Sequence, residues 1–268
     1  MRKFIVPGIL LVMLAFWISP AAAIVFGDLD GGDHPNVGLL LITLPDREPI
    51  PVCSGILVED PRAFLTAGHC TSLLQDAIDQ QIITKENVKV SFDQDNALKD
   101  GLVDVEGLFT HPEFNNSSPQ SNPHDVGIVT LKQDGPQPQQ LPDEGFLETL
   151  ELRGAKFNVV GYGAFPEEGQ KPKDIVDPDG ARRVAESEYQ KLLKTRLRLS
   201  QNQSHDQGGS CFKDSGGPVF LKANNTETLV AIVSSGDSAC VSMSTNYRLD
   251  IEDSLGFING IISQIQGE

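Results

Sequence analysis

The sequence lacks the excess of basic residues that nucleic-acid-binding proteins need. Its 268 residues contain 21 lysines and arginines against 37 aspartates and glutamates, a formal net charge of −16. A nucleic acid is a polyanion that such a surface repels, so nucleic-acid binding is disfavoured. We find no internal repeat either.

A long apolar segment that could span a membrane is also missing. The N-terminal apolar run, Phe4 to Ile18, is shorter than the roughly 20 residues that a membrane helix needs. It follows Arg2 and Lys3 and precedes three alanines, a pattern typical of a signal-peptidase site. We predict that residues 1–23 are a cleaved signal peptide, with an uncleaved anchor as the less favoured alternative. The mature chain would then be secreted, extracellular or periplasmic, without membrane contact and with a formal charge of −18.

Metal ligands at a recognisable spacing are absent too. The four cysteines and five histidines include no pair such as Cys-x-x-Cys or His-x-x-x-His, so we predict no metal site. Export makes disulfide bonds permissible, and four cysteines allow three pairings. Spacing alone leaves these pairings open.

The chain does contain many short runs of β-branched and apolar residues. Clusters of Gly, Pro, Asn and Asp separate the runs, which predicts short antiparallel strands and an all-β barrel or sandwich. The runs cover residues 37–44, 55–58, 88–92, 102–108, 126–131, 157–160, 218–221 and 229–234.

Two segments are predicted to be helical. Within Leu255 to Ile265, apolar residues recur at i, i+3, i+6, i+7 and i+10, the pattern of an amphipathic C-terminal helix. We also predict a helix over Ala185 to Leu193.

Three short motifs carry the chemistry. Ser215 lies in a glycine-permissive turn, and a serine hydroxyl becomes a useful nucleophile only beside a base that a third group orients. His69, within Thr-Ala-Gly-His-Cys, is the candidate base, because histidine exchanges protons near neutral pH. Asp125, ahead of Val-Gly-Ile-Val-Thr-Leu, is the candidate orienting group.

These motifs, TAGHC, DVGIVTL and CFKDSGGP, resemble those of the trypsin/chymotrypsin-like family of secreted serine endopeptidases. The segments IVFG at 24–27, VGYG at 160–163 and IVSSG at 232–236 extend the resemblance. It implies two six-stranded antiparallel Greek-key barrels with the active site in the cleft between them. We expect the N-terminal barrel at about 24–140 and the C-terminal barrel at about 141–268.

The resemblance also implies roles for individual residues. His69, Asp125 and Ser215 would be the catalytic residues, and the disulfide bonds would join Cys53 with Cys70 and Cys211 with Cys240. Cleavage after residue 23 would make Ile24 the N-terminus, and its ammonium would pair with Asp214. We therefore expect no separate activation cleavage.

The backbone N–H groups of Lys213 and Ser215 would form the oxyanion hole. Lys213 departs from the glycine usual there, and a side chain penalises a positive φ by about 1–2 kcal/mol. The implied substrate pocket has no charge at its base, which favours an apolar or aromatic residue before the cleaved bond. Its residues would be Gly209, Ser210, Phe212, Ser234, Ser235 and Gly236.

We thus predict a secreted serine endopeptidase that works through an acyl-enzyme without a cofactor. Polypeptides would be its substrates, and a protein protease inhibitor is a partner that the resemblance allows. One alternative is a weakly active or inactive binding protein with the protease fold, favoured by Lys213 and by Ser235, where the family often has tryptophan. The other is an esterase, although the Gly-x-Ser-x-Gly motif of α/β-hydrolases is absent around Ser215.

Overall fold

The computed structural model describes residues 24, 26–115, 124–166, 175–176, 178–224 and 226–267. The predicted signal peptide, residues 1–23, lies outside this part of the chain. None of the helices within it has the length and apolar composition needed to cross a membrane.

Six antiparallel strands close into a first barrel in the order β2-β3-β4-β7-β6-β5. Strands β4 and β7 are buried along their length because alternate residues face two different cores. Phe64 and Val129 pack inside one core, whereas Leu65 and Ile128 pack in a core shared with the second barrel. The strands are β2 (Val37–Ile42), β3 (Ile50–Leu57), β4 (Ala63–Thr66), β5 (Val88–Ser91), β6 (Leu102–Thr110) and β7 (Gly127–Leu131).

A second ring of six antiparallel strands closes through the pairing of β8 with both β11 and β13. The prediction of two six-stranded barrels is confirmed. The strands are β8 (Lys156–Gly161), β11 (Arg183–Leu192), β12 (Arg196–Ser200), β13 (Pro218–Ala223), β14 (Thr226–Gly236) and β15 (Met243–Arg248). Two-residue strands β9 (Phe165–Pro166) and β10 (Ile175–Val176) pair beside this barrel.

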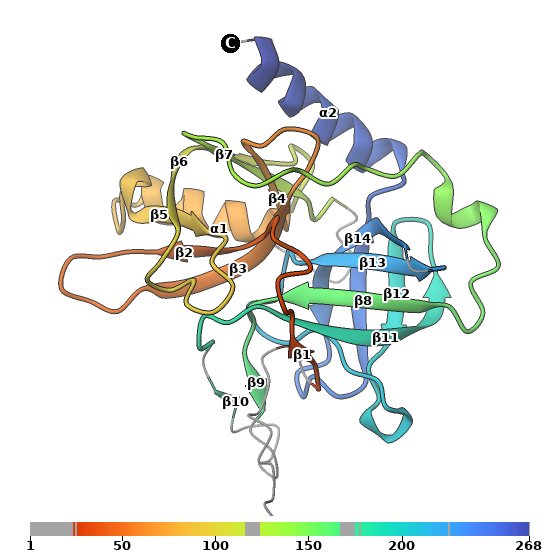
Figure 1. The fold of residues 1–268 in the computed structure, drawn as a ribbon. Coiled ribbons are helices and arrows are strands. Elements are labelled where there is room, and N and C mark those ends of the chain that lie inside the picture. The colour runs from red at the N-terminus through yellow and green to blue at the C-terminus, as the bar shows by residue number, and fades with distance from the viewer. Residues whose placement is uncertain are drawn as a thin grey trace, which may run out of the picture.

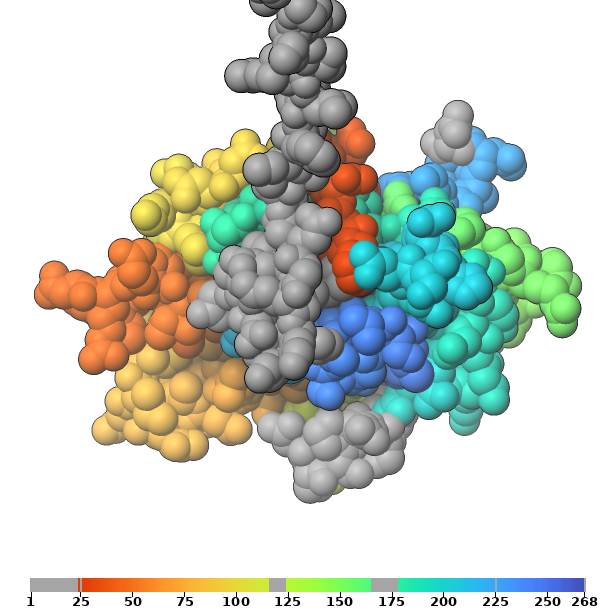
Figure 2. Space-filling model, turned by 90° about the horizontal axis from the view of Figure 1, so that it is seen from below, coloured from red at the N-terminus to blue at the C-terminus, as the bar shows by residue number. Residues whose placement is uncertain are grey.

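The two terminal segments of the chain cross over between the barrels (Figure 1). The N-terminal segment packs on the second barrel, and the C-terminal helix contacts the first. Strand β1 (Asp28–Leu29) pairs with β11, and Ile24 is buried in the core of the second barrel, although we expected the first barrel to begin near residue 24. At the other end, helix α2 crosses back to the first barrel, where Arg62 Nη2 donates to Ile265 O at 2.8 Å. In Figure 2 the red N-terminal residues lie between the two halves.

The helices only partly follow the sequence pattern. Helix α2 (Glu252–Gly267) confirms the predicted C-terminal helix and begins three residues earlier. Helix α1 (Gly68–Asp79), which starts at the His69 motif, was not predicted. The described residues also contain three short 3-10 helices: η1 (Lys85–Asn87), η2 (Phe146–Thr149) and η3 (Gln203–His205).

The helix predicted over residues 185–193 is wrong, because this segment forms most of β11. Buried and partly exposed residues alternate from Arg183 to Glu188, the period of a strand. The pairing partners, β8 and β12, supply backbone hydrogen bonds on both sides, and this tertiary context overrides the helical preference of alanine, glutamate and lysine.

A buried arginine joins the two barrels. Arg182, which is 1% exposed, precedes β11, and its Nε donates to Asp30 Oδ2 at 2.8 Å. Its Nη1 donates to Val37 O (3.1 Å) and Phe92 O (3.2 Å) of the first barrel and to Tyr162 OH (2.9 Å) beside the second. Because a buried charge needs such partners, this network favours one relative position of the barrels.

His34 links this network to strands β13 and β14 of the second barrel. Its Nδ1 contacts Asp30, its Nε2 lies 2.7 Å from Glu227 Oε2, and its ring stacks on Phe220. Burial disfavours the charged ring, but the carboxylates of Asp30 and Glu227 outweigh burial and raise the pKa of His34 to about 9.

This raised pKa predicts a pH-dependent stability. Because the folded-state pKa exceeds the unfolded value of 6.5, the contribution of His34 is complete below about pH 6.5 and disappears as pH rises through about 9. We expect His34→Gln to cost about 2–3 kcal/mol near pH 6 and much less near pH 10, measured by urea unfolding. The exposed His205 gives the control: as a surface substitution, His205→Gln should change the free energy of unfolding by less than about 0.5 kcal/mol. An equal cost of His34→Gln at both pH values would contradict the assignment.

Candidate active site

The first barrel presents His69 and Asp125 as a hydrogen-bonded pair. His69 lies in the first turn of α1, and Asp125 lies just before β7. His69 Nδ1 is 3.0 Å from Asp125 Oδ2 and 3.1 Å from Oδ1, and the His69 backbone N–H donates to Oδ1 at 2.9 Å. A carboxylate only accepts, so Nδ1 carries a proton, and in the neutral form of the ring Nε2 has the free lone pair.

Asp125 remains ionised although it is 4% exposed. Burial pushes its pKa upward, but hydrogen bonds from His69 and Ser234 outweigh burial and hold the pKa below its ordinary value. Ser234 belongs to β14 of the second barrel, and its Oγ donates to Asp125 Oδ2 at 2.6 Å. The sequence predicts Ser234 in the substrate pocket, but Ser234 is not among the residues that line the cavity. Nothing in its sequence context indicates the hydrogen bond to Asp125.

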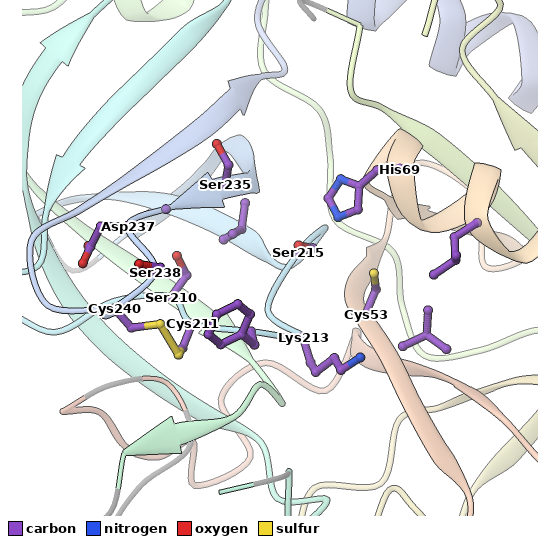
Figure 3. Close-up of a pocket in the computed structure, with 15 residues that line it drawn as sticks. Cys53, His69, Ser210, Cys211, Lys213, Ser215, Ser235, Asp237, Ser238 and Cys240 are labelled. Atoms are coloured by element: carbon purple, nitrogen blue, oxygen red, sulfur yellow. A yellow bond between two sulfur atoms is a disulfide. The ribbon is translucent and has the colours of Figure 1, made fainter. Parts of the chain in front are cut away.

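The second barrel presents Ser215 in a turn that requires glycine. Gly216 has φ +81°, and a Cβ there would lie 2.1 Å from Thr66 Oγ1, so no other residue fits. The Gly216 N–H donates to Val233 O at 2.7 Å. This turn places Ser215 on the same cavity as His69, and Figure 3 shows the imidazole beside the serine. No hydrogen bond joins the two side chains within the described residues, and such contacts are often loose before substrate binds.

Ser54 of β3 holds the serine turn from the first barrel. Its N–H donates to Ser215 O at 3.0 Å, and its Oγ donates to Lys213 O at 3.1 Å. The same Oγ accepts the Tyr162 N–H at 3.0 Å, and Ser54 is fully buried. The backbone and the side chain of this one residue of the opposite barrel thus hold both Ser215 and Lys213.

Two backbone N–H groups of the turn point to no acceptor within the described residues. These are the amides of Lys213 and Ser215, whereas the neighbouring amides of Asp214, Gly216 and Gly217 all have protein acceptors. Lys213 has φ +75°, the left-handed conformation that a glycine would adopt more cheaply. Unpaired neighbouring N–H groups can bind an oxyanion.

The cavity beside Ser215 has a volume of about 440 Å³. Four of the six predicted pocket residues line it: Ser210, Phe212, Ser235 and Gly236. The remaining lining residues are Val52, Cys53, His69, Leu73, Cys211, Lys213, Ser215, Val233, Asp237, Ser238 and Cys240.

Gly209, the predicted pocket base, is not among the lining residues. A Cβ on Gly209 would lie 2.4 Å from Gln201 Oε1, so the Gln201 side chain fills the space beside it. Gln201 is fully buried, and its Nε2 donates to Ser210 O at 3.2 Å. No local pattern marks Gln201 as part of the site, because η3 and its flanking loop separate it from the serine motif.

Asp214 is fully buried, and among the described residues no cation lies within ion-pair distance of its carboxylate. Its oxygens accept the N–H groups of Gly163 (2.7 Å) and Cys211 (2.9 Å). Burial outweighs both these donors and the charge of Arg183, and it raises the pKa of Asp214 to about 7. The Ile24 nitrogen is a peptide nitrogen in the full-length chain, so it carries no charge that could pair with Asp214.

Both predicted disulfide bonds are confirmed. Cys53 pairs with Cys70, which ties β3 to the start of α1, and Cys211 pairs with Cys240 across the cavity wall. They brace the segments on either side of Ser215.

A histidine cluster lies directly before Asp125. His124 Nδ1 is 3.0 Å from the Asp253 carboxylate and its Nε2 is 3.2 Å from Glu113 Oε2, while the stacked His111 ring has Nε2 3.7 Å from Asp253. Asp253 is far from the other three residues in sequence, so a spacing argument could not find the cluster. The Glu113 N–H donates to His111 Nδ1 at 3.2 Å, which leaves the proton on Nε2 facing the carboxylate. We assign the cluster to anchoring the first turn of α2.

Two closed β-barrels with a histidine–aspartate pair facing a serine turn across their cleft define the chymotrypsin-like class of proteins. The family model described as Trypsin matches residues 37–248, and the chain belongs to this trypsin family of serine proteases.

Two curated relatives are similar over much of the chain. The CLIP domain-containing serine protease B15 of Anopheles gambiae is 28% identical over 82% of this chain. Granzyme C of Mus musculus is 24% identical over 63% of this chain. The matches cover just under two thirds of the length of each relative, 64% and 65% respectively.

The contacts of Ser54 predict a mobile serine turn when its hydroxyl is lost. Ser54→Ala leaves Lys213 O and Tyr162 N–H unpaired, and we expect a cost of about 1–3 kcal/mol in the free energy of unfolding. We also expect faster amide hydrogen exchange in residues 213–217.

Ser91 is the matched control, because it is also fully buried, donates to Asp100 O and accepts the Asp93 N–H. Ser91→Ala should cost similar stability without changing exchange in the serine turn. Unchanged exchange of that turn in Ser54→Ala would contradict the role of Ser54.

Proposed function

We propose that the protein is a secreted serine endopeptidase that uses Ser215 as nucleophile, His69 as general base and Asp125 as the group that orients His69. The observation that carries this proposal is the pairing of His69 with buried, ionised Asp125 at the cavity that Ser215 lines. The signal-peptide pattern of residues 1–23 supports secretion.

In the first step, Ser215 Oγ attacks the carbonyl carbon of the peptide bond, and its proton moves to His69 Nε2. Asp125 stabilises the imidazolium that forms. The carbonyl oxygen gains the electron pair, and the N–H groups of Lys213 and Ser215 bind the resulting oxyanion.

Collapse of this intermediate breaks the carbon–nitrogen bond, and His69 returns the proton to the leaving amine. The acyl group remains on Ser215. Water then repeats the sequence with His69 as base, and the carboxylic acid leaves. The positive φ of Lys213 favours the active protein over the inactive binding alternative, because the turn already has the conformation that leaves both N–H groups unpaired.

The cavity supports a neutral primary pocket. Ser210, Ser235 and Gly236 line it without a charged group, so we propose an apolar or aromatic residue before the cleaved bond. Asp237 also lines the cavity, but its carboxylate accepts the N–H groups of Ser242 and Met243, each at 3.0 Å, which stabilises the adjoining loop.

Labelling with a fluorophosphonate tests the nucleophile. We expect wild type to be modified at Ser215, Ser215→Ala to resist modification, and His69→Ala to react at least about a hundredfold more slowly because it lacks the base. Ser204→Ala, at an exposed serine of η3, should react like wild type. Peptide mapping by mass spectrometry identifies the modified residue. A wild type that resists the reagent, or a Ser215→Ala variant that reacts equally well, would overturn the proposal.

We further propose that cleavage after residue 23 completes the site by freeing an ammonium at Ile24 for Asp214. The Ile24 side chain is already fully buried in the second barrel, the same barrel whose serine turn carries Asp214. An ammonium would supply the cation that the buried carboxylate lacks.

The raised pKa of Asp214 gives this maturation step a pH signature. Because the folded-state pKa of about 7 exceeds the ordinary 3.8, ionisation of Asp214 destabilises the chain that retains residues 1–23. This loss of stability is absent below about pH 4 and complete above about pH 7. As pH rises between these values, the chain that starts at Ile24 should become about 2–4 kcal/mol more stable than the chain that retains residues 1–23.

Urea unfolding of both forms, each carrying Ser215→Ala to prevent autolysis, measures the difference. Asp214→Asn should abolish its pH dependence. N-terminal sequencing of the secreted protein checks the cleavage position directly. A mature chain that starts elsewhere, or a stability difference independent of pH, would contradict the maturation proposal.

A further inference from the structure

The cavity beside Ser215 has a different charge at each end. Asp237 and Ser238 lie on one side of Ser215, whereas the Lys213 side chain extends to the other side, below Cys53 (Figure 3). Val52 of β3 and Leu73 of α1 also line the cavity and come from the first barrel, as Cys53 does. A cation and apolar side chains thus occur together on the first-barrel side.

The two charges differ in how they are satisfied. The Asp237 carboxylate accepts backbone N–H groups of its own loop, as described above. Lys213 Nζ has no carboxylate within ion-pair distance in the described part of the chain, in contrast to Lys156 and Lys222, which both pair with Glu186. In a chain with a net charge of −16, the Lys213 ammonium is therefore available to a negatively charged group that enters the cavity.

The backbone does not require a lysine here. At φ +75° glycine would form the same turn more cheaply, and the Ser54 contact to Lys213 goes to the carbonyl oxygen, which every residue has. What the lysine adds is its side chain, an aliphatic stem with a cationic end on the wall of the cavity.

We propose that Lys213 forms a subsite for an acidic residue on the leaving-group side of the cleaved bond. This inference rests on the proposed endopeptidase function, in which the acyl half of the substrate lies over Ser210, Ser235 and Gly236. The leaving half then passes on the side of Cys53. Because the Lys213 N–H binds the oxyanion, the Lys213 side chain lies close to the cleaved bond. On the leaving-group side it would contact the first or second residue after that bond. Aspartate or glutamate there would gain an ion pair, with Val52 and Leu73 against the methylene groups.

Matched internally quenched peptides test the subsite. They are identical before the cleaved bond and carry glutamate, glutamine or lysine at the first or second position after it. We expect wild type to prefer glutamate over glutamine about three- to tenfold in kcat/KM, as for a partly exposed ion pair. The preference should fall in high salt, which screens such a pair.

Variants assign the preference to the ammonium. In Lys213→Met the glutamate-to-glutamine ratio should approach one, and in Lys213→Glu it should fall below one, with the lysine peptide now preferred. Lys222→Met removes one positive charge from the exposed end of β13 and should leave the ratio at its wild-type value.

Each outcome bears on one proposal. A wild-type ratio of one, or a Lys213→Met ratio equal to that of wild type, would overturn the subsite while peptide cleavage itself upholds the proposed function. If wild type cleaves none of the peptides and also resists the fluorophosphonate, the proposed function fails and the subsite fails with it.

Discussion

The contact between the two barrels is the constraint on which the site depends. His69 and Asp125 belong to the first barrel and Ser215 to the second, so their arrangement exists only while the barrels keep one relative position. Three sets of buried hydrogen bonds fix that position: Ser54 holds the serine turn, Ser234 donates to Asp125, and Arg182 bridges both barrels. Each removes a polar group from water and pairs it across the interface, so a shift of the barrels would leave several groups unpaired.

Two buried aspartates show how partners decide the state of a carboxylate. Asp125 is held by a histidine and a serine hydroxyl, and its pKa lies below the ordinary value. Within the described residues the Asp214 carboxylate accepts only backbone N–H groups, and burial raises its pKa to about 7 despite these donors and the charge of Arg183. The same residue type at similar burial therefore has two different environments. The environment of Asp125 favours the carboxylate that the proposed mechanism needs, whereas Asp214 has no cation within ion-pair distance among the described residues.

Local motifs predicted the candidate site and most strands of this protein better than they predicted its packing. His69, Asp125 and Ser215 stand in short motifs, and all eight apolar runs became strands, because these signals are contained in a few consecutive residues. The sequence of β11 predicts a helix, but its partners β8 and β12, which are distant in sequence, decide that it is a strand. The contacts of Ser54 and Ser234, and the place of Gln201 against Gly209, join residues far apart in sequence, and no local pattern encodes them.

We propose that the two barrels assemble a serine nucleophile with its base and oxyanion site already in place. The decisive measurement is a rapid-mixing experiment with a chromogenic ester, since acylation releases the chromophore before the acyl-enzyme hydrolyses. We expect a burst close to one equivalent of chromophore per chain, absent in Ser215→Ala. Ester turnover without a burst, and equal in Ser215→Ala, would contradict it.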